Sequence, residues 1–308
     1  MDKKLLSVCV PVYNEAENIA AAYERITAVM SSLCAYDYEI VFFDDGSTDG
    51  SAELIEGLCR SDEKVRAVFY ARNFGYSKTV FYCMQQAKGD AAIIVHCDLQ
   101  NPPEEIPKLV EKWEQGADVA LGVKNKSREN RLMYFLRTLA YFVMNFVFGM
   151  HMVPHATEFE LLDRSVLDVL RDIHTQNPYL RGYILEYGRH IEKVYYVQDK
   201  RRGGSTHFNL KKYYEFALGG IVSMSRCLPR RFILFSVISI LALLVEFFAR
   251  FLPAASGEVF WSGLLLRFGV FSALLLILLV SILFEYILTL INNTEDKPFI
   301  IEDRRINY

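Results

Sequence analysis

Short apolar runs alternate with amphipathic helical patterns through the first part of the chain. The apolar runs have the length and residue content of buried strands, and they cover Leu6–Val12, Glu39–Phe43, Val65–Tyr70 and Ala91–His96. The helical patterns between them cover Ala16–Leu33, Ser51–Cys59 and Ser77–Ala87. Strands that alternate with helices predict a parallel sheet of the α/β class.

Polar clusters follow three of the predicted strands at the point where each strand ends. They are Tyr13-Asn14-Glu15, Asp44-Asp45-Gly46-Ser47 and Asp98-Leu99-Gln100. In an open parallel sheet, ligands bind beyond the carboxyl ends of the strands. The sequence therefore predicts a binding site at this edge.

Three carboxylates lie in the cluster after the second strand. Asp44, Asp45 and Asp49 can accept hydrogen bonds from a base or a ribose. Alternatively, Ser47 or Asp49 can serve as the N-cap of the helix that begins at Ser51. Both interpretations stay open at this stage.

His96, Asp98 and Gln100 alternate at the end of an apolar run, before two prolines. If the strand continues this far, its period of two places the three side chains on one face. An imidazole, a carboxylate and an amide oxygen together can hold a divalent cation. The alternative is that His96 is a core residue with satisfied hydrogen bonds.

Two long apolar segments lie near the end of the chain. Phe232–Leu252 and Leu264–Ile291 each reach the roughly 20 residues that a bilayer span requires. The short linker Pro253–Gly263 predicts an antiparallel transmembrane hairpin. Two buried helices of a soluble bundle are the alternative.

Basic residues predict the orientation of this hairpin. Arg226, Arg230 and Arg231 precede the first segment, Arg304 and Arg305 follow the second, and the linker has neither Lys nor Arg. The positive-inside rule then places both ends in the cytoplasm.

The chain is therefore expected to divide into four parts. The divisions are a cytoplasmic catalytic domain at 1–208, a juxtamembrane amphipathic helix at 209–231, the transmembrane helices 232–252 and 264–291, and a cytoplasmic tail at 292–308. Within the first part, segment 131–150 is aromatic and apolar only over Leu139–Met150, about 12 residues, which is too short to span a bilayer. It is expected to be an interfacial helix or a core helix.

Composition narrows the function classes. The chain has 308 residues, with 34 Lys or Arg, 37 Asp or Glu and 52% hydrophobic residues. This balance excludes a disordered chain, a collagen-like chain and a polybasic nucleic-acid binder. The six cysteines form no C-x-x-C pair, which excludes a zinc ribbon and a thioredoxin-type redox pair. No signal-peptide pattern begins the sequence, so we expect the first domain to remain in the cytosol.

Basic residues also cluster next to the segments placed at the membrane. They are Lys124, Lys126, Arg128, Arg131 and Arg137, followed later by Lys200, Arg201 and Arg202. Such donors suit a phosphate at that surface, although a run of charge is often only a solvated face.

Several strings, in order along the chain, resemble one enzyme family. They are Val10-Pro-Val-Tyr-Asn-Glu15, Asp44-Asp-Gly-Ser-Thr-Asp49, Arg72-Asn-Phe-Gly75, Asp98-Leu-Gln-Asn-Pro-Pro-Glu104, Phe159-Glu-Leu-Leu-Asp-Arg164, Leu180-Arg-Gly182, Arg201-Arg-Gly-Gly204 and Lys297-Pro-Phe-Ile-Ile301. The chain resembles the membrane-bound polyprenyl-phosphate glycosyltransferases of inverting family 2, such as dolichol-phosphate mannose synthase and the bactoprenol glucosyltransferases. The resemblance implies a GT-A, Rossmann-like α/β domain that transfers a sugar from a nucleotide-sugar to a polyprenyl phosphate.

The resemblance also implies roles for individual residues. The nucleotide-sugar would bind among Pro11, Tyr13, Glu15, Phe43, Asp45, His96, Cys97 and Lys124. A Mg2+ or Mn2+ ion would bind Asp98 and Gln100, with His96 beside them. The acceptor phosphate would meet Arg128, Arg131, Arg201, Arg202 and His207. Asp98 and Arg201 would be the catalytic residues.

The chain departs from the family pattern at several of these positions. His96 replaces the first carboxylate of an Asp-x-Asp string, and Glu160 replaces an Arg. Lys124, Thr206 and His207 replace an Arg, a Ser and a Lys. Because imidazole is a softer ligand than carboxylate, His96 favours Mn2+ over Mg2+.

The departures leave the activity of the chain open. Alternatives to the family reaction are an altered donor and a catalytically silent membrane partner of an active transferase. A processive polysaccharide synthase is disfavoured, because the chain has only two predicted spans and no Q-x-x-R-W string. The expected donor is a UDP-sugar, the expected acceptor is undecaprenyl phosphate, and the expected location is the inner membrane. A homo-oligomer is possible.

Overall fold

The computed structural model describes residues 3–126, 152–198 and 298–308, with single residues and short helical pieces between 138 and 149 and between 237 and 290. Most of the predicted hairpin and all of the juxtamembrane helix 209–231 lie outside the described residues. So do five predicted phosphate-binding residues, Arg128, Arg131, Arg201, Arg202 and His207. Within the part of the chain that is described, no helix is long and apolar enough to cross a membrane.

Eight strands form one mixed sheet in the order β7-β5-β6-β4-β1-β2-β3-β8. Their bounds are β1 Leu5–Val12, β2 Asp37–Asp44, β3 Val65–Tyr70, β4 Ala91–Ile94, β5 Val119–Lys126, β6 Ala156–Asp163, β7 Ile191–Val197 and β8 Glu302–Ile306. The strands β4, β1, β2 and β3 run parallel, as the sequence predicts. Strand β6 is antiparallel to both β4 and β5, and β8 is antiparallel to β3.

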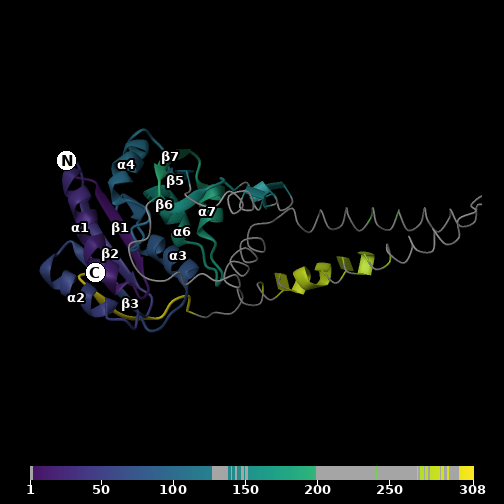
Figure 1. The fold of residues 1–308 in the computed structure, drawn as a ribbon, viewed down its shortest axis with the longest axis horizontal. Coiled ribbons are helices and arrows are strands. Elements are labelled where there is room, and N and C mark those ends of the chain that lie inside the picture. Colours follow the sequence, from purple (N-terminus) through teal and green to yellow (C-terminus); the bar gives the residue numbers. More distant parts are fainter. Residues whose placement is uncertain are drawn as a thin grey trace, which may run out of the picture.

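Helices cover both faces of the sheet (Figure 1). They are α1 Ala16–Ser32, α2 Ser51–Ser61, α3 Tyr76–Gln86, the short 3-10 helix η1 Pro103–Glu105, α4 Ile106–Glu114, α6 Arg164–Arg171 and α7 Leu180–Tyr187. One buried cluster joins the sheet to α1, α2 and α4, and a second joins its other face to α3, α6 and α7. The predicted strands and helices of the first half are confirmed within a few residues.

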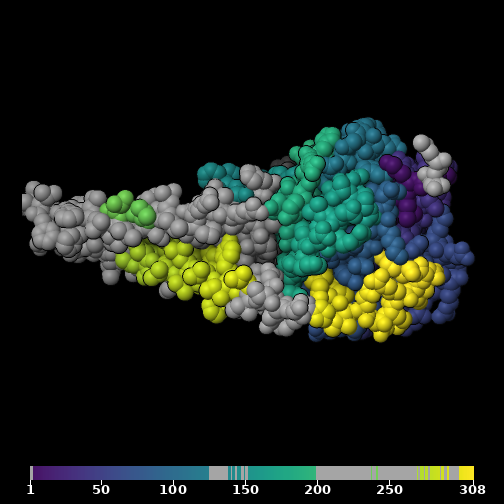
Figure 2. All heavy atoms as spheres, turned by 180° about the vertical axis from the view of Figure 1, so that it is seen from behind, coloured from purple at the N-terminus to yellow at the C-terminus, as the bar shows by residue number. Residues whose placement is uncertain are grey.

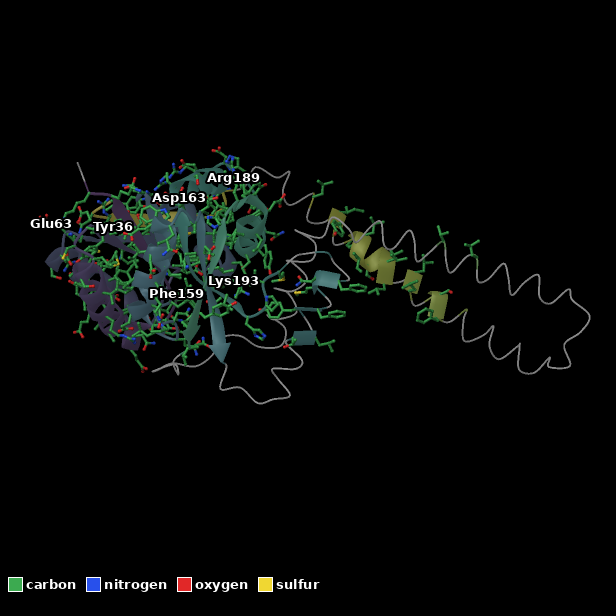
Figure 3. The ribbon with its side chains drawn as sticks, turned by 90° about the horizontal axis from the view of Figure 1, so that it is seen from above. Tyr36, Glu63, Phe159, Asp163, Arg189 and Lys193 are labelled. Atoms are coloured by element: carbon green, nitrogen blue, oxygen red, sulfur yellow. The ribbon has the colours of Figure 1, made fainter. Side chains whose placement is uncertain are left out.

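Burial on both faces explains why the central strands are continuous apolar runs. Phe42 and Phe43 are neighbours in β2 and both are fully buried, each in a different cluster. Phe159 of β6 is likewise completely buried, whereas Glu63 and Arg189 are exposed near the rim (Figure 3).

Two details of the predicted strand Ala91–His96 are wrong. Strand β4 ends at Ile94, and the chain then turns, with Leu99 at a φ of 55°. The two-residue period of a strand therefore does not place His96, Asp98 and Gln100 on one face. Their side chains are nevertheless partly exposed, while those of Cys97 and Leu99 between them are buried.

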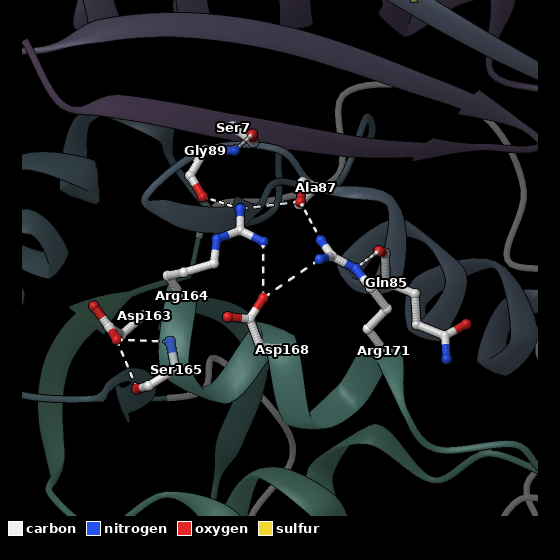
Figure 4. Close-up of polar contacts among 9 residues, drawn as sticks. All are labelled: Ser7, Gln85, Ala87, Gly89, Asp163, Arg164, Ser165, Asp168 and Arg171. Atoms are coloured by element: carbon white, nitrogen blue, oxygen red, sulfur yellow. Dashed lines mark hydrogen bonds and ion pairs between the residues drawn. The ribbon is translucent and has the colours of Figure 1, made fainter.

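Two arginines of α6 fasten this helix to the end of α3 (Figure 4). The guanidinium of Arg164 donates to the carbonyls of Ala87 and Gly89, and that of Arg171 donates to Gln85 and Ala87. Asp168 pairs with both arginines, at 3.5 and 3.4 Å. Cationic side chains at the carboxyl end of a helix donate hydrogen bonds to its free carbonyls and interact favourably with the helix dipole. These contacts therefore hold α3 and α6 together on the same face of the sheet.

The C-terminal residues rejoin the sheet, which the sequence does not predict for the expected tail 292–308. Strand β8 pairs with β3, and Phe299 packs on Phe81 and Tyr82 of α3. Beyond the strand, the Tyr308 hydroxyl donates to the carbonyl of Gln86 at 2.7 Å. These residues form a yellow band on the surface of the domain (Figure 2). The end of the chain is thus part of the folded domain.

Asn307 fixes this last segment, which gives a test of its role. Its side-chain amide donates to the carbonyls of Cys59 and Val65, at 2.7 and 2.9 Å, and its φ is 58°. We expect Asn307→Ala to lower the free energy of unfolding by about 1–3 kcal/mol, because both bonds are lost and Ala is strained at positive φ. Denaturant unfolding of the full chain measures this loss.

Two further variants isolate the cause. Asn307→Gly should lose less stability than Asn307→Ala, because glycine accepts this backbone conformation. Asp303→Ala, which removes an exposed ion pair to Arg304, should lose almost none. Equal stability of Asn307→Ala and the wild type would contradict the assigned role.

Candidate functional site

The loops after β1 and β2 are tied together by side-chain hydrogen bonds. Asn14 donates its backbone N–H to Ser47 Oγ at 2.9 Å and accepts from the N–H of Thr48 at 2.8 Å. Asp49 accepts from the N–H groups of Ala16 and Ser51, at 3.0 and 3.1 Å, and so serves the first turns of both α1 and α2. The N-cap of α2 is Gly50, so neither Ser47 nor Asp49 is the N-cap considered from the sequence, although Asp49 accepts from the first N–H of this helix. These bonds bring the first two predicted polar clusters together.

Asp45 connects the second cluster to a third loop. Its carboxylate accepts from the backbone N–H groups of Phe74 and Gly75, at 2.6 and 3.0 Å. Burial raises the pKa of Asp45 to about 6, although these hydrogen bonds act in the opposite direction. Both oxygens already have partners in the chain, so Asp45 shapes the wall of the site.

Asp44 is also buried, but it has fewer partners. Its Oδ2 accepts from the N–H of Ser47 at 3.2 Å, and its Oδ1 has no hydrogen-bond partner. Burial raises its pKa above the usual value. Because Asp44 is only 3% exposed and this oxygen is buried, the oxygen does not face the surface of the site in this structure.

The residues expected to surround the nucleotide-sugar differ in accessibility. Pro11, Tyr13 and Glu15 are partly exposed at the end of β1. The side chain of Phe43 is completely buried and that of Cys97 is 2% exposed, so neither side chain faces a ligand in this structure. The side chains of Phe42 and Phe43 point to opposite faces of strand β2, and helices cover both faces of the sheet.

Lys124 lies at the other side of the sheet, on β5. Its side chain is partly exposed, and its backbone N–H donates to the carbonyl of His155 at 3.1 Å. The structure thus places Lys124 beside the segment that leads into β6.

A chain of polar side chains begins at His96. The hydroxyl of Tyr76 lies 3.3 Å from His96 Nε2, and the two rings stack with centroids 5.7 Å apart. The same hydroxyl donates to Glu158 Oε2. Glu158 in turn forms an ion pair with Arg181, at 3.3 Å between Oε1 and Nε. His96 follows strand β4, and Tyr76 is the first residue of helix α3. Glu158 lies in strand β6 and Arg181 in helix α7.

Glu160 lies two residues further along β6, on the same face as Glu158. It is fully buried, and neither carboxyl oxygen has a hydrogen-bond partner. Burial and, to a smaller extent, the charge of Glu158 raise its pKa to about 8, while Arg181 acts in the opposite direction. Glu160 is therefore protonated at neutral pH, because a buried charge without partners is strongly unfavourable.

A small cavity of about 10 Å³ lies beside Tyr76, Glu158 and Arg181, with room for roughly one water molecule. Its polar lining comes from Tyr76, Ser77, Glu158 and Arg181. The sequence strings contain Glu160 and Arg181, and Glu158 directly precedes one of them, but sequence reasoning did not place these residues or Tyr76 in the site. The available signal was a pair of carboxylates inside a strand that is otherwise apolar, since Glu is rarely buried without a specific role.

The predicted metal ligands Asp98 and Gln100 form hydrogen bonds within the protein. Asp98 Oδ1 accepts from the backbone N–H of Gln100 at 3.1 Å, and Gln100 Oε1 lies 3.4 Å from the amide of Gln198. Among the described residues, no three His, Cys, Asp or Glu side chains are grouped as a metal site. Mg2+ and Mn2+ bound with nucleotides often take only one or two protein ligands, and phosphate oxygens complete the shell. Asp98 and Gln100, with His96 two positions before Asp98 and all three side chains partly exposed, offer the ligand types that such a site uses.

Comparison with known proteins identifies the family. Residues 7–181 match the model of "Glycosyl transferase family 2". The chain belongs to this family. It is therefore a glycosyltransferase that uses a nucleotide-sugar, and its mixed sheet covered by helices on both faces is the GT-A fold.

Family 2 relatives cover most of the chain. It is 31% identical over 301 residues to the uncharacterized glycosyltransferase YkcC of Bacillus subtilis, covering 96% of this chain and 92% of the relative. It is 34% identical over 221 residues to the prophage bactoprenol glucosyl transferase homolog of Escherichia coli, covering 71% and 72%. Glucosyl-3-phosphoglycerate synthase of Mycobacterium tuberculosis shares the fold, with a TM-score of 0.50 at 18% identity, over 71% of this glycosyltransferase and 76% of that chain.

Glu160 makes the stability of this glycosyltransferase depend on pH. Its pKa is about 8 in the folded state and 4.5 as the reference value, so the unfolded state releases the proton first as the pH rises. Its contribution to stability is therefore lost between pH 4.5 and about 8, at about 1.4 kcal/mol per pH unit. Glu160→Gln keeps the shape and cannot ionise.

Thermal unfolding of both proteins between pH 5 and pH 8 checks this. We expect the melting temperature of Glu160→Gln to exceed that of the wild type by an amount that grows as the pH rises. Other groups titrate in both proteins and cancel in the difference. A constant difference across this range would show that Glu160 keeps an ordinary pKa.

Proposed function

We propose that this glycosyltransferase transfers a sugar from a UDP-sugar to a polyprenyl phosphate at the cytoplasmic face of the membrane, with inversion at the sugar. The similarity to the bactoprenol glucosyl transferase homolog, at 34% identity over 221 residues, carries this proposal. The bactoprenol glucosyl transferase of Shigella phage SfV is equally similar. Undecaprenyl phosphate is the expected acceptor.

The strand-end site suits a nucleotide-sugar. The tied loops after β1 and β2 form one side of it, with Tyr13 and Glu15 partly exposed. Asp98 and Gln100 follow β4, next to β1 in the sheet. Asp98, with His96 and Gln100 beside it, would hold a Mn2+ or Mg2+ ion. Such an ion neutralises the charge that develops on the departing diphosphate.

The acceptor explains why the site needs no general base. The second pKa of a phosphate monoester is about 6, so a lipid phosphate is largely dianionic at neutral pH and already nucleophilic. One of its oxygens attacks C1 of the sugar in line, and the nucleoside diphosphate leaves from the opposite side. The protein mainly positions two anions that repel each other, for which we propose Arg201 and the neighbouring basic residues.

Contact with the membrane is part of the proposal. Leu139, Phe142 and Phe146 are 46%, 60% and 66% exposed, and the rings of Phe142 and Phe146 stack. Large apolar side chains exposed together favour a lipid interface. The two apolar segments at 232–252 and 264–291 would anchor the enzyme as a hairpin.

A donor screen tests the proposed reaction. Purified full-length enzyme is given undecaprenyl phosphate and a panel of UDP- and GDP-sugars, and release of nucleoside diphosphate is followed with and without Mn2+. We expect release that requires both the lipid and the metal. Asp98→Asn should lower turnover by about 100-fold or more, because loss of a group that stabilises developing charge has effects of this size. Absence of turnover with every donor would favour the silent-partner alternative.

Cysteine labelling in intact cells tests the hairpin. An impermeant thiol reagent should label Ser256→Cys, in the predicted outer linker, and leave Asp303→Cys, an exposed residue of β8, unlabelled. The parent protein corrects for the native cysteines. Labelling of Asp303→Cys alone would invert the topology.

A further inference from the structure

Four side chains in sequence connect the proposed metal site to helix α7. They are His96, Tyr76, Glu158 and Arg181, and each contacts the next. The chain passes from the loop after β4 to the first residue of α3, then to β6 and α7. His96 is thus held by a ring stack and a polar contact on one side of its imidazole.

The hydrogen positions in this chain follow from donor and acceptor chemistry. A carboxylate only accepts hydrogen bonds, so the single hydroxyl hydrogen of Tyr76 points to Glu158. The oxygen of Tyr76 is then left as an acceptor, and His96 must supply the hydrogen from Nε2. The reverse arrangement would bring two oxygen atoms of Tyr76 and Glu158 together without a hydrogen between them. In a neutral imidazole, a hydrogen on Nε2 leaves Nδ1 with a free lone pair.

We propose that Tyr76 and Glu158 are positioning residues that hold His96 in the tautomer with its hydrogen on Nε2, so that Nδ1 binds the divalent cation beside Asp98. This inference rests on the proposed function. Histidines that bind metals commonly donate their other ring N–H to a carboxylate, which fixes the tautomer and increases the basicity of the ligand. Here the carboxylate acts through a tyrosine hydroxyl. Arg181 pairs with the other oxygen of this carboxylate and so holds Glu158 in place.

The proposed ligand set implies a preference among metals. A nitrogen and a carboxylate form a better site for Mn2+ than for Mg2+, which prefers oxygen. Among the described residues no three His, Cys, Asp or Glu side chains are grouped as a metal site. Diphosphate oxygens then complete the shell.

Binding of Mn2+ to the full-length protein in the presence of UDP, measured by calorimetry, tests this role without any reaction. Tyr76→Phe keeps the ring and removes the hydroxyl, and we expect it to weaken Mn2+ binding about 10- to 100-fold. Mg2+ binding should change less. Tyr82→Phe is the matched control, because Tyr82 also lies on α3 and its hydroxyl also donates to a glutamate, Glu302, far from His96. It should bind Mn2+ as the wild type does.

A double-mutant cycle separates positioning from a general structural effect. In a His96→Ala background, which itself binds Mn2+ more weakly, Tyr76→Phe should have no further effect. An equal effect in both backgrounds, or unchanged Mn2+ affinity in Tyr76→Phe, would overturn the proposal, as would a wild type that binds no Mn2+ with UDP. The proposed function fails separately: Mn2+ bound as described but no turnover with lipid phosphate would reject the reaction and leave the role of Tyr76 and Glu158 supported.

Discussion

The carboxylate of Asp45 is the contact on which the strand-end site most depends. Asp45 directly follows β2, and its carboxylate accepts hydrogen bonds from the backbone N–H groups of Phe74 and Gly75, in the loop between β3 and α3. Gly46 beside it allows close contact, because a Cβ there would lie 2.6 Å from the backbone of Arg72. Since α3 begins at Tyr76, the same carboxylate sets where that helix starts and hence where the tyrosine hydroxyl lies. Loop geometry, helix position and the orientation of His96 are therefore linked.

The central strands could be predicted from the sequence because they are buried on both faces. Such strands are uninterrupted apolar runs, and their polar ends mark one edge of the sheet. Strand β6 was missed because Glu158 and Glu160 interrupt its apolar pattern. Strand β8 was missed for a different reason: its sequence, Glu302 to Ile306, is mostly charged, as befits a short edge strand whose side chains meet water.

The contacts that shape the candidate site could not be read from local patterns. Asp44, Asp45 and Asp98 were identified from their place after strands, and the structure puts them at the expected edge. The partner of His96 was not identifiable, because an aromatic residue at the start of a helix has no distinctive local signal. Arg181 lies more than 80 positions from His96 in the sequence. It belongs to helix α7, and it is connected to His96 through Glu158 of β6 and Tyr76 of α3.

One departure from the family pattern changes the charge of this cluster less than its residue types imply. Where the resemblance implies an Arg, this chain has Glu160 on β6. Burial raises the pKa of Glu160 to about 8, so at neutral pH it does not add a second negative charge beside Glu158 and its ion-pair partner Arg181. A carboxyl group is tolerated at this buried position of the strand because it keeps its proton. The proton on Glu160 therefore supports the ion pair of Glu158, and Glu158 in turn holds the Tyr76 hydroxyl that contacts His96 at the end of β4.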